Sequence, residues 1–410
     1  MAPVNTASPS VFDAGLPTIE YDVATATPAQ LYPKFQAAQR LAPIALGPYG
    51  PEVLSYDLVR TMLRDNRFQI PPGYILAVQG ITSGPLWDKV VNSLLGMEGA
   101  KHQRVRGVVA KAFTPRAVER LHATIVEVID EIAEPISRRG HCDVVSDIAR
   151  PYPVPVICAL LGAPREDWQQ FSLWADDIFK AFNFTFTAAD VPDVMRAWGE
   201  LDDYVDDMIA RRRHTLTDDL LSDLIRAEHD GDRLNHDELR MLAAALLLAG
   251  TDTTRNQVAA SIGVLCDHPD QWELLRDRPE LAMTAVDETM RHSPIANSLV
   301  RVAAQDVELA GVLFPEGTMI FSNTAAANRD PAIYDDPDRF DITREGLPPV
   351  LNFGAGVHYC VGANLARLEI AEALRTVTRR IANPRKNGPS PWKPFVGLSG
   401  PSTLPIAFDT

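Results

Sequence analysis

The spacing of hydrophobic residues along the chain predicts a protein made mostly of helices, with a few short strands. In a series of segments the apolar side chains recur with the period of an α-helix, so each segment has one apolar face. These are residues 56–64, 104–113, 118–137, 168–182, 194–213, 218–226 and 279–292. Shorter apolar runs at 52–55, 298–302, 307–309 and 318–322 are typical of strands. The pattern predicts a mainly α fold with small β-sheets.

The longest predicted helix begins at Asn235, a good cap residue followed by acids, and runs to about Cys266. Such a helix of about 30 residues is roughly 45 Å long. Its middle breaks the apolar pattern, because Ala249 to Thr254 reads Ala-Gly-Thr-Asp-Thr-Thr. Threonine hydroxyls there can bond a carbonyl of the preceding turn, and Gly250 permits a neighbour to approach closely. Buried polar groups are costly unless used, but taken alone the segment also fits a kink at a helix surface.

A second unusual feature is the glycine-rich loop 353–362, which carries Cys360 just before a predicted helix at 363–374. A helix N-terminus stabilises a thiolate, which can act as a metal ligand or a nucleophile. The four cysteines form no close pair, which excludes a zinc knuckle or a short-spaced iron–sulfur cluster. One axial thiolate on a haem iron needs a single cysteine and small flanking residues. A nucleophile with His358 as its base, or a buried free cysteine, remains an alternative at this point.

The run 353–367 resembles the haem-binding signature of the cytochrome P450 family of haem-thiolate monooxygenases. The matching residues are Phe353, Gly354, Gly356, His358, Cys360, Gly362, Leu365, Ala366 and Arg367. The resemblance implies a single, mainly α, prism-shaped domain with small β-sheets. It also implies haem b between the long central helix and the cysteine loop with its helix, with Cys360 as the axial ligand.

Other segments resemble the family's motifs in the expected order. Ala249 to Thr254 is similar to the oxygen-activation segment, which implies that Thr253 holds the oxygen molecule and that Asp252 feeds protons. The resemblance implies a haem-binding set of Cys360, His102, Arg106, Arg301, His358, Phe353, Gly354, Gly362 and Ala249, in which the two histidines and two arginines bind the propionates. It further implies a structural charge network of Glu288, Arg291 and Arg339. The expected substrate pocket includes Leu246, Ile295, Leu299, Phe182 and Leu398.

The sequence departs from the family pattern in two places. Glu98-Gly-Ala-Lys101 stands where the family often has an Asp-Pro-Pro approach to the His102 position, which puts the loop geometry in doubt. The C-terminal hairpin, residues 396–405, is longer than the common pattern, so the roof of the pocket is expected to differ.

Composition adds limits on location and partners. The chain has 410 residues without a linker or repeat, so we expect a disordered leader at 1–15 and one domain at 16–410. The longest strongly apolar segment found in the sequence, 242–249, is short of the ~20 residues of a membrane span, and sparse cysteines suit a reducing compartment. We therefore expect a cytoplasmic monomer without a membrane anchor. The net charge of −15 argues against nucleic acid as a partner.

The resemblance predicts an enzyme that inserts one oxygen atom of O₂ into a C–H bond of a neutral, apolar molecule such as a terpenoid, steroid-like or alkyl compound. The chain carries no reductase-like segment, so electrons are expected from an iron–sulfur ferredoxin and its NAD(P)H-dependent flavin reductase. Basic residues for docking such an acidic donor are Arg104, Lys111, Arg116 and Arg120. The alternatives are a peroxide-driven peroxygenase and a non-catalytic haem-thiolate protein that binds a ligand or gas.

Overall fold

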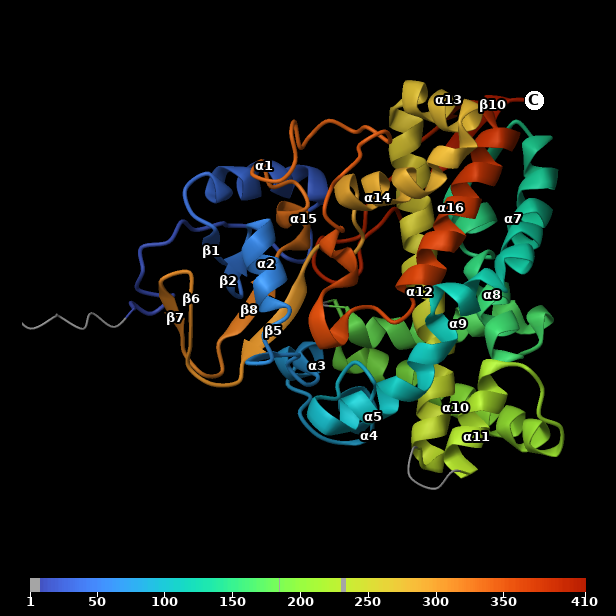
Figure 1. Ribbon diagram of the computed structural model, residues 1–410, viewed down its shortest axis with the longest axis horizontal. Coiled ribbons are helices and arrows are strands. Elements are labelled where there is room, and N and C mark those ends of the chain that lie inside the picture. The colour runs from blue at the N-terminus through green and yellow to red at the C-terminus, as the bar shows by residue number, and fades with distance from the viewer. Residues whose placement is uncertain (1–7, 184, 230–233) are drawn as a thin grey trace, which may run out of the picture.

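The computed structural model describes residues 8–183, 185–229 and 234–410. Figure 1 shows a large helical body on one side and a smaller, sheet-containing part on the other. The helices are α1 (Pro28–Gln39), α2 (Tyr56–Met62), α3 (Tyr74–Val78), α4 (Pro85–Val91), α5 (Gly99–Val109), α6 (Pro115–Glu119), α7 (His122–Ser137), α8 (Pro153–Leu161), α9 (Trp168–Phe179), α10 (Val191–His214), α11 (Leu220–His229), α12 (His236–Asp267), α13 (Pro269–Asp277), α14 (Ala282–His292), α15 (Thr324–Ala327) and α16 (Ala363–Arg380).

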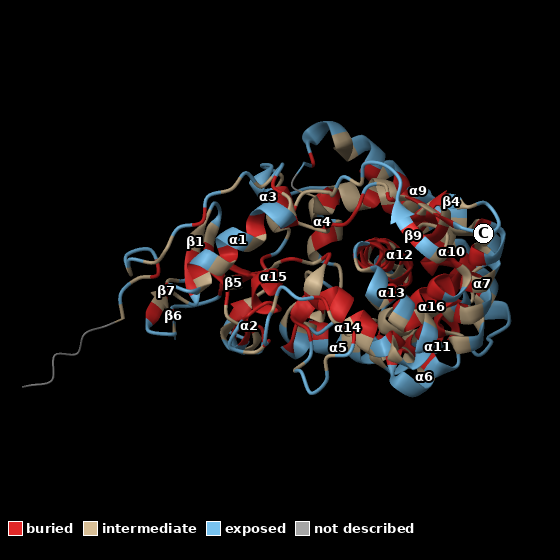
Figure 2. Cartoon of the chain, turned by 90° about the horizontal axis from the view of Figure 1, so that it is seen from above, coloured by how far each residue is buried: buried red, intermediate tan, exposed pale blue. Residues whose placement is uncertain are grey.

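The long helix α12 is the axis of the helical body. Asn235 caps it: its side chain accepts the Glu238 N–H at 2.9 Å, and the Glu238 carboxylate accepts the Asn235 N–H at 3.1 Å. Helices α8, α9, α10, α14 and α16 pack around α12. Most of α12 is therefore buried, and Figure 2 shows it inside the body of the molecule. The predicted central helix is confirmed over almost its whole length.

The strands form three small sheets. They are β1 (Ile44–Gly47), β2 (Gly50–Val53), β3 (Phe68–Gln69), β4 (His141–Asp143), β5 (Leu299–Ala303), β6 (Val307–Leu309), β7 (Val312–Phe314), β8 (Met319–Ser322), β9 (Ala382–Lys386) and β10 (Pro405–Asp409). The largest sheet has five strands in the order β1-β2-β8-β5-β3. In it Arg301 of β5 lies opposite Ile320 of β8, and Gln69 of β3 lies opposite Val302. The sheet thus fixes the position of the one arginine in an otherwise apolar strand.

The mainly α fold with small sheets is confirmed, whereas several element boundaries differ from the prediction. The predicted helix 118–137 is two helices, α6 and α7, separated by a turn at Arg120 and Leu121. The predicted helix 168–182 ends at Phe179 and continues as a 3₁₀ turn, Lys180–Phe182. Helical spacing alone does not show such breaks, because the apolar face continues through them.

The N-terminal region is more firmly attached than a loose leader. Val11 is fully buried, and its N–H donates to the Leu313 carbonyl oxygen at 2.8 Å. The Leu313 N–H in turn donates to the Pro9 carbonyl oxygen at 2.8 Å. The expected disordered leader 1–15 is therefore wrong for residues 9–11, which pack against β7. Residues 1–7 of that predicted leader lie outside the described residues.

One stretch of the described residues, Val144–Leu161, has the length and mean hydropathy, 1.4, of a membrane span. It is a π-helical turn, Val144–Ala149, followed by α8, and 61% of it is buried inside the protein. Both pieces pack on α12. The stretch is thus a core neighbour of α12, and segment 242–249 is not the longest apolar stretch of the chain.

Candidate active site

The cysteine loop before α16 is shaped by glycines and one backbone hydrogen bond. Gly354 and Gly356 have φ angles of 73° and 69°, in the left-handed region that favours glycine. A Cβ on Gly356 would lie 2.6 Å from the Leu63 carbonyl oxygen, so only glycine fits where the loop passes the end of α2. The Cys360 N–H donates to the Phe353 carbonyl oxygen at 2.8 Å and closes the loop. The loop therefore presents the cysteine side chain in a fixed position.

Cys360 differs from the other cysteines in accessibility. All four cysteines lie in the described part of the chain, and Cys360 alone is exposed. Surrounding protein raises the pKa of its thiol, while the N–H of Gly362 and the Arg106 guanidinium lower it. Burial raises the pKa of the other three thiols to about 12; these belong to Cys142, Cys158 and Cys266. Cys360 is therefore the cysteine that fits a ligand role.

The middle of α12 has an accessible strip on an otherwise buried helix. Ala249 is exposed, and Gly250 and Thr253 are half-buried. Thr253 Oγ1 donates to the Ala249 carbonyl oxygen at 2.8 Å, and the helix remains a continuous α-helix. A Cβ on Gly250 would meet the Ile157 side chain of α8 at 3.1–3.3 Å, so this glycine allows α8 to pack closely. The predicted close approach at Gly250 is present, and its neighbour is α8.

Asp252 and Thr253 are adjacent in sequence but have different surroundings. Asp252 is 5% exposed and accepts a hydrogen bond from Arg255 Nε at 2.7 Å. Arg255 also donates to Asp176 of α9 at 2.6 Å, and Arg150 donates to the same carboxylate. The prediction missed these partners of Asp252. The three-residue spacing of Asp252 and Arg255 was visible in the sequence, whereas the approach of α9 was not.

His102, Arg106 and His358 lie together beside the cysteine loop, and the Glu98 carboxylate links Arg301 to them. The rings of His102 and His358 lie 4.2 Å apart, and Nε2 of each has no hydrogen-bond partner. Arg106 donates to the Tyr359 carbonyl oxygen. Arg301 is 5% exposed and donates to the Val300 carbonyl oxygen at 2.8 Å. These side chains come from α5, β5 and the cysteine loop.

The electrostatics of this cluster show a shortage of negative charge. Burial lowers the pKa of His102 to about 4, with further lowering by His358 and Arg106. Burial also lowers the pKa of Arg301 to about 10, and the Glu98 carboxylate acts in the opposite direction. Two arginines and two histidines share one nearby carboxylate, Glu98, and both ring Nε2 atoms lack a hydrogen bond, so the cluster suits a ligand with two carboxylates. The two propionates of haem meet that requirement, so the residues present fit the cofactor.

The predicted structural network is centred on Glu288 and Arg291. These two residues of α14 form a bidentate ion pair at 2.7 and 2.8 Å and are almost fully buried. Arg291 also donates to the carbonyl oxygens of Pro337 at 2.7 Å and Arg339 at 3.0 Å. The network thus ties α14 to the loop that precedes the cysteine loop.

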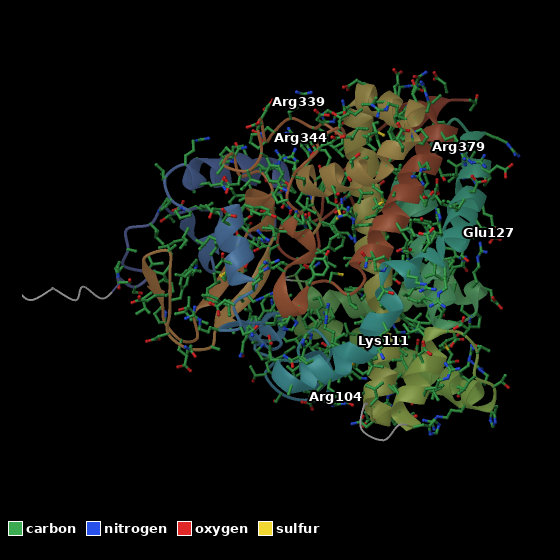
Figure 3. All side chains as sticks on the ribbon, viewed as in Figure 1. Arg104, Lys111, Glu127, Arg339, Arg344 and Arg379 are labelled. Carbon is green, nitrogen blue, oxygen red and sulfur yellow. The ribbon has the colours of Figure 1, made fainter. Side chains whose placement is uncertain are left out.

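The side chain of Arg339 does not belong to this network. It is 65% exposed and pairs with Asp341 at 3.0 Å. Arg344 instead lies 3.4 Å from Glu288 and donates to the carbonyl oxygens of Asp335, Asp336 and Arg339 at 2.7, 2.7 and 2.9 Å. Figure 3 labels both arginines on this loop. The expectation for Arg339 is therefore wrong for its guanidinium, because the turn brings only its carbonyl inward.

Of the expected pocket residues, Leu299 is the first residue of β5 and Ile295 lies four residues before it. A Cβ on Gly354 would be 3.5 Å from Leu299 Cδ1, so Leu299 borders the cysteine loop. The Ile295 carbonyl oxygen accepts the Ser399 N–H at 2.9 Å, which brings the C-terminal hairpin to the segment before β5.

The C-terminal hairpin contacts both the segment before β5 and the turn after α9. Leu398 forms an isolated β-bridge with Ala296. A Cβ on Gly397 would lie 3.7 Å from the Phe182 carbonyl oxygen, so the hairpin also reaches the turn after α9. Leu246 lies on the same side of α12 as the exposed strip. Leu299 is thus next to the cysteine loop and Leu246 next to the strip, whereas Leu398 lies beside Ala296.

Comparisons with known proteins agree with this arrangement. The family model for Cytochrome P450 matches residues 91–382. Luteothin monooxygenase of Streptomyces thioluteus is 35% identical over 377 residues, which cover 92% of this chain and 92% of that protein. Vitamin D(3) 25-hydroxylase of Pseudonocardia autotrophica is 40% identical over 318 residues, covering 77% of this chain and 73% of that protein. The crystal structure of CalO2 has a TM-score of 0.88 and 32% identity, and covers 95% of this chain and 99% of that chain. The chain belongs to the cytochrome P450 family of monooxygenases, which bind haem b through a cysteine thiolate.

Proposed function

We propose that this protein hydroxylates, or similarly oxidises, an apolar small molecule, with Cys360 as the haem ligand. The observation that carries the proposal is one accessible thiol near Arg106 and near two histidines whose ring Nε2 atoms have no hydrogen bond. Bound haem supplies the redox chemistry: one atom of O₂ enters a C–H bond and the other leaves as water, with two electrons and two protons consumed. The protein must position the substrate, the oxygen molecule and the protons.

Thr253 and Asp252 are proposed to handle the protons. The Thr253 hydroxyl gives its hydrogen to the Ala249 carbonyl, so its oxygen lone pairs remain free to accept a hydrogen bond from a water or from the reacting group. Asp252 is a buried carboxylate on the preceding residue, linked through Arg255 and Asp176 toward the surface. Side-chain exposure along this line rises from 7% at Asp252 to 12% at Arg255 and 31% at Asp176. A buried acid with a charged connection to solvent suits proton supply.

The substrate is proposed to be neutral and apolar, such as a terpenoid, a steroid-like compound or an alkyl chain. The expected wall residues are aliphatic or aromatic: Leu246, Ile295, Leu299, Phe182 and Leu398. Nearby charged groups have partners elsewhere, since Asp252 pairs with Arg255 and Lys393 donates to Asn256 at 2.9 Å. An anionic or cationic substrate would lack a counter-charge in such a pocket. Two relatives are named Luteothin monooxygenase and Vitamin D(3) 25-hydroxylase, names that assign those proteins the oxidation of an organic compound.

Electrons are proposed to come from a ferredoxin and its NAD(P)H-dependent flavin reductase, in a cytoplasmic, monomeric enzyme. Of the basic residues expected to dock the donor, Arg104 pairs with Glu238 at 2.6 Å and Arg120 lies 3.7 Å from Asp218. In the described part of the chain, Lys111 and Arg116 are exposed and show no ion pair. Figure 3 places Lys111 and Arg104 along α5 and the turn after it. Lys111 and Arg116 are therefore the cations most available to an acidic partner.

Two measurements test the proposal. The reduced carbon monoxide complex should show the strongly red-shifted Soret band of thiolate ligation, and Cys360→His should lose it. Apolar compounds of the proposed classes should shift the haem spin state and be oxidised when ferredoxin, reductase and NAD(P)H are added. Turnover with hydrogen peroxide but not with the donor proteins would indicate a peroxygenase. Tight ligand binding without turnover in either system would indicate a non-catalytic protein.

A further inference from the structure

Glu98 lies where three parts of the active site meet. It precedes α5, the helix that carries His102 and Arg106. One carboxylate oxygen, Oε1, accepts the N–H of Ile70 at 2.8 Å and lies 3.0 Å from His358 Nε2. The contact with His358 has the distance of an ion pair but forms no hydrogen bond. The oxygen therefore makes its hydrogen bond to Ile70 and acts on His358 through charge.

The bond to Ile70 closes a long segment at its base. Residues 71–97 lie between the two bonded residues and include α3 and α4. Ile70 directly follows β3, which pairs with the Arg301 strand β5. Further along, α3 packs against the turn Lys180–Phe182, and Lys89 of α4 pairs with Asp202 of α10. The segment thus runs from the sheet to the helices beside the pocket, and Glu98 fastens its base.

The local backbone favours this arrangement. Gly99 has a φ of 62°, which a residue with a side chain rarely adopts, so the chain can turn sharply right after Glu98. This Glu-Gly pair is part of the departure from the Asp-Pro-Pro pattern noted in the sequence. Glutamate is one methylene longer than aspartate, and that length lets the carboxylate reach back to Ile70. The Glu-Gly pair at this place therefore permits the hydrogen bond between Glu98 and Ile70.

The charge of Glu98 also acts on the cationic cluster. Its carboxylate raises the pKa of both Arg301 and His102, against the lowering caused by burial. Within the described residues, no other carboxylate acts on these two groups or pairs with His358. Three elements with cationic side chains would otherwise repel one another around the cofactor's edge. Glu98 contributes the protein's own negative charge at that place.

We propose that Glu98 is a positioning residue with two separable roles. Its oxygen atom fastens the base of segment 71–97 beside the pocket through the Ile70 N–H. Its negative charge balances Arg301, His102 and His358 at the edge of the haem. The first role requires a hydrogen-bond acceptor, whereas the second requires a charge, so a neutral isostere separates them.

Three variants of the haem-loaded enzyme test both roles. Glu98→Ala removes the acceptor and the charge, Glu98→Gln keeps an acceptor oxygen but not the charge, and Lys101→Gln is a control that removes an exposed charge from the same turn. We expect Glu98→Ala to be cleaved within 71–97 roughly tenfold faster by a protease, the factor for one lost hydrogen bond. Glu98→Gln should be cleaved at the wild-type rate. Both Glu98 variants should have a more positive haem midpoint potential, because a negative charge near the iron is lost.

Each role has an outcome that overturns it. Cleavage of Glu98→Ala at the rate of the Lys101→Gln control would overturn the fastening role, and so would cleavage of Glu98→Gln as fast as Glu98→Ala. An unchanged midpoint potential in Glu98→Gln would overturn the charge role. If Glu98→Ala fails to fold, Glu98→Leu replaces it in the cleavage comparison, and the midpoint potential of Glu98→Gln still decides the charge role. None of these readouts depends on the identity of the substrate.

Discussion

At the scale of single residues, the adjacent side chains of Asp252 and Thr253 point in different directions and bind different partners. Thr253 is bonded to its own helix at the Ala249 carbonyl, on the accessible strip. Asp252, one residue earlier, is turned to Arg255 and through it to α9. Successive residues of an α-helix point about 100° apart, so one residue can reach the pocket while the other reaches a charged neighbour. Their substitution should therefore have distinguishable effects.

Thr253→Ala should uncouple oxygen consumption from product formation. Without the hydroxyl, the proton-bearing water is no longer held in place, so reduced oxygen leaves as hydrogen peroxide. NAD(P)H should still be consumed while product per NAD(P)H falls severalfold. Measurement of NAD(P)H, peroxide and product in the same reaction tests this, and full coupling in the variant would contradict it.

Asp252→Asn should slow the whole reaction, by about a hundredfold if Asp252 acts as a positioned proton donor, and with less loss of coupling. The same three measurements apply. Equal and small effects of both substitutions would indicate that the Ala249–Thr254 segment is only a structural feature of α12.

Arg344 and Arg339 form a matched pair that tests the buried network. Arg344→Gln should lower the free energy of unfolding by about 2 kcal/mol, because it removes several hydrogen bonds to carbonyls and a neighbour of Glu288. Arg339→Gln should cost less than about 0.5 kcal/mol, since its side chain is exposed. Chemical denaturation of both variants measures the difference, and a larger loss for Arg339→Gln would contradict the assignment.

At the scale of elements, the close packing of α8 against α12 depends on Gly250, which has no side chain. Ile157 of α8 fills the space beside Gly250, where a Cβ would come within 3.1–3.3 Å. Alanine is normally preferred over glycine within a helix, by about 1 kcal/mol. The glycine is therefore explained by close packing, and it lies next to the accessible strip that the site requires.

Gly250→Val should force α8 and α12 apart and lower stability by about 2 kcal/mol through overpacking. Ile157→Val removes the Cδ1 atom that a side chain at 250 would meet at 3.2 Å. The double variant should therefore lose less stability than the sum of the two single variants. Thermal unfolding measures all three, and strictly additive losses would show that the two positions do not meet.

The sequence predicted those features that are local or carried by a motif. The central helix and the turn geometry of the cysteine loop are present as expected, and His102 and His358 lie side by side. Arg255, Asp176, Glu98 and Arg344 were missed because their roles depend on which elements come together in space. Helix spacing shows which residues share a face, but not which helix covers that face. Arg339 was misassigned for a related reason, since a turn decided whether its side chain or its carbonyl points inward.

At the scale of the whole molecule, His292 lies at a junction between the helical body and the sheet-containing part. It ends α14, and its carbonyl oxygen accepts a hydrogen bond from Arg329 at 2.7 Å. Arg329 lies over the ring of Tyr32 in α1, 4.0 Å from its centre. Burial lowers the pKa of His292 to about 2, helped by Arg329 and Arg291. The folded protein therefore keeps this histidine neutral.

This histidine should make the enzyme less stable in mild acid. An unfolded chain protonates it near its ordinary pKa of about 6.5, whereas the folded chain does not, so its contribution is fully present above that pH and is lost below it. Between pH 7.5 and 5.5 the loss should be about 1.4 kcal/mol. His292→Gln should show a correspondingly smaller change in unfolding free energy over this range. An identical change in variant and wild type would contradict the prediction.

The distribution of the cysteines provides a way to measure which fraction of the protein molecules carries haem. Three thiols are buried with pKa values of about 12, and one is exposed at the cofactor site. Protein prepared without haem should take up a single maleimide per chain, and haem-loaded protein should take up none, because the sulfur is then bound to iron. Mass spectrometry of a labelled preparation would thus count the fraction of molecules that carry cofactor, without recourse to an absorption coefficient.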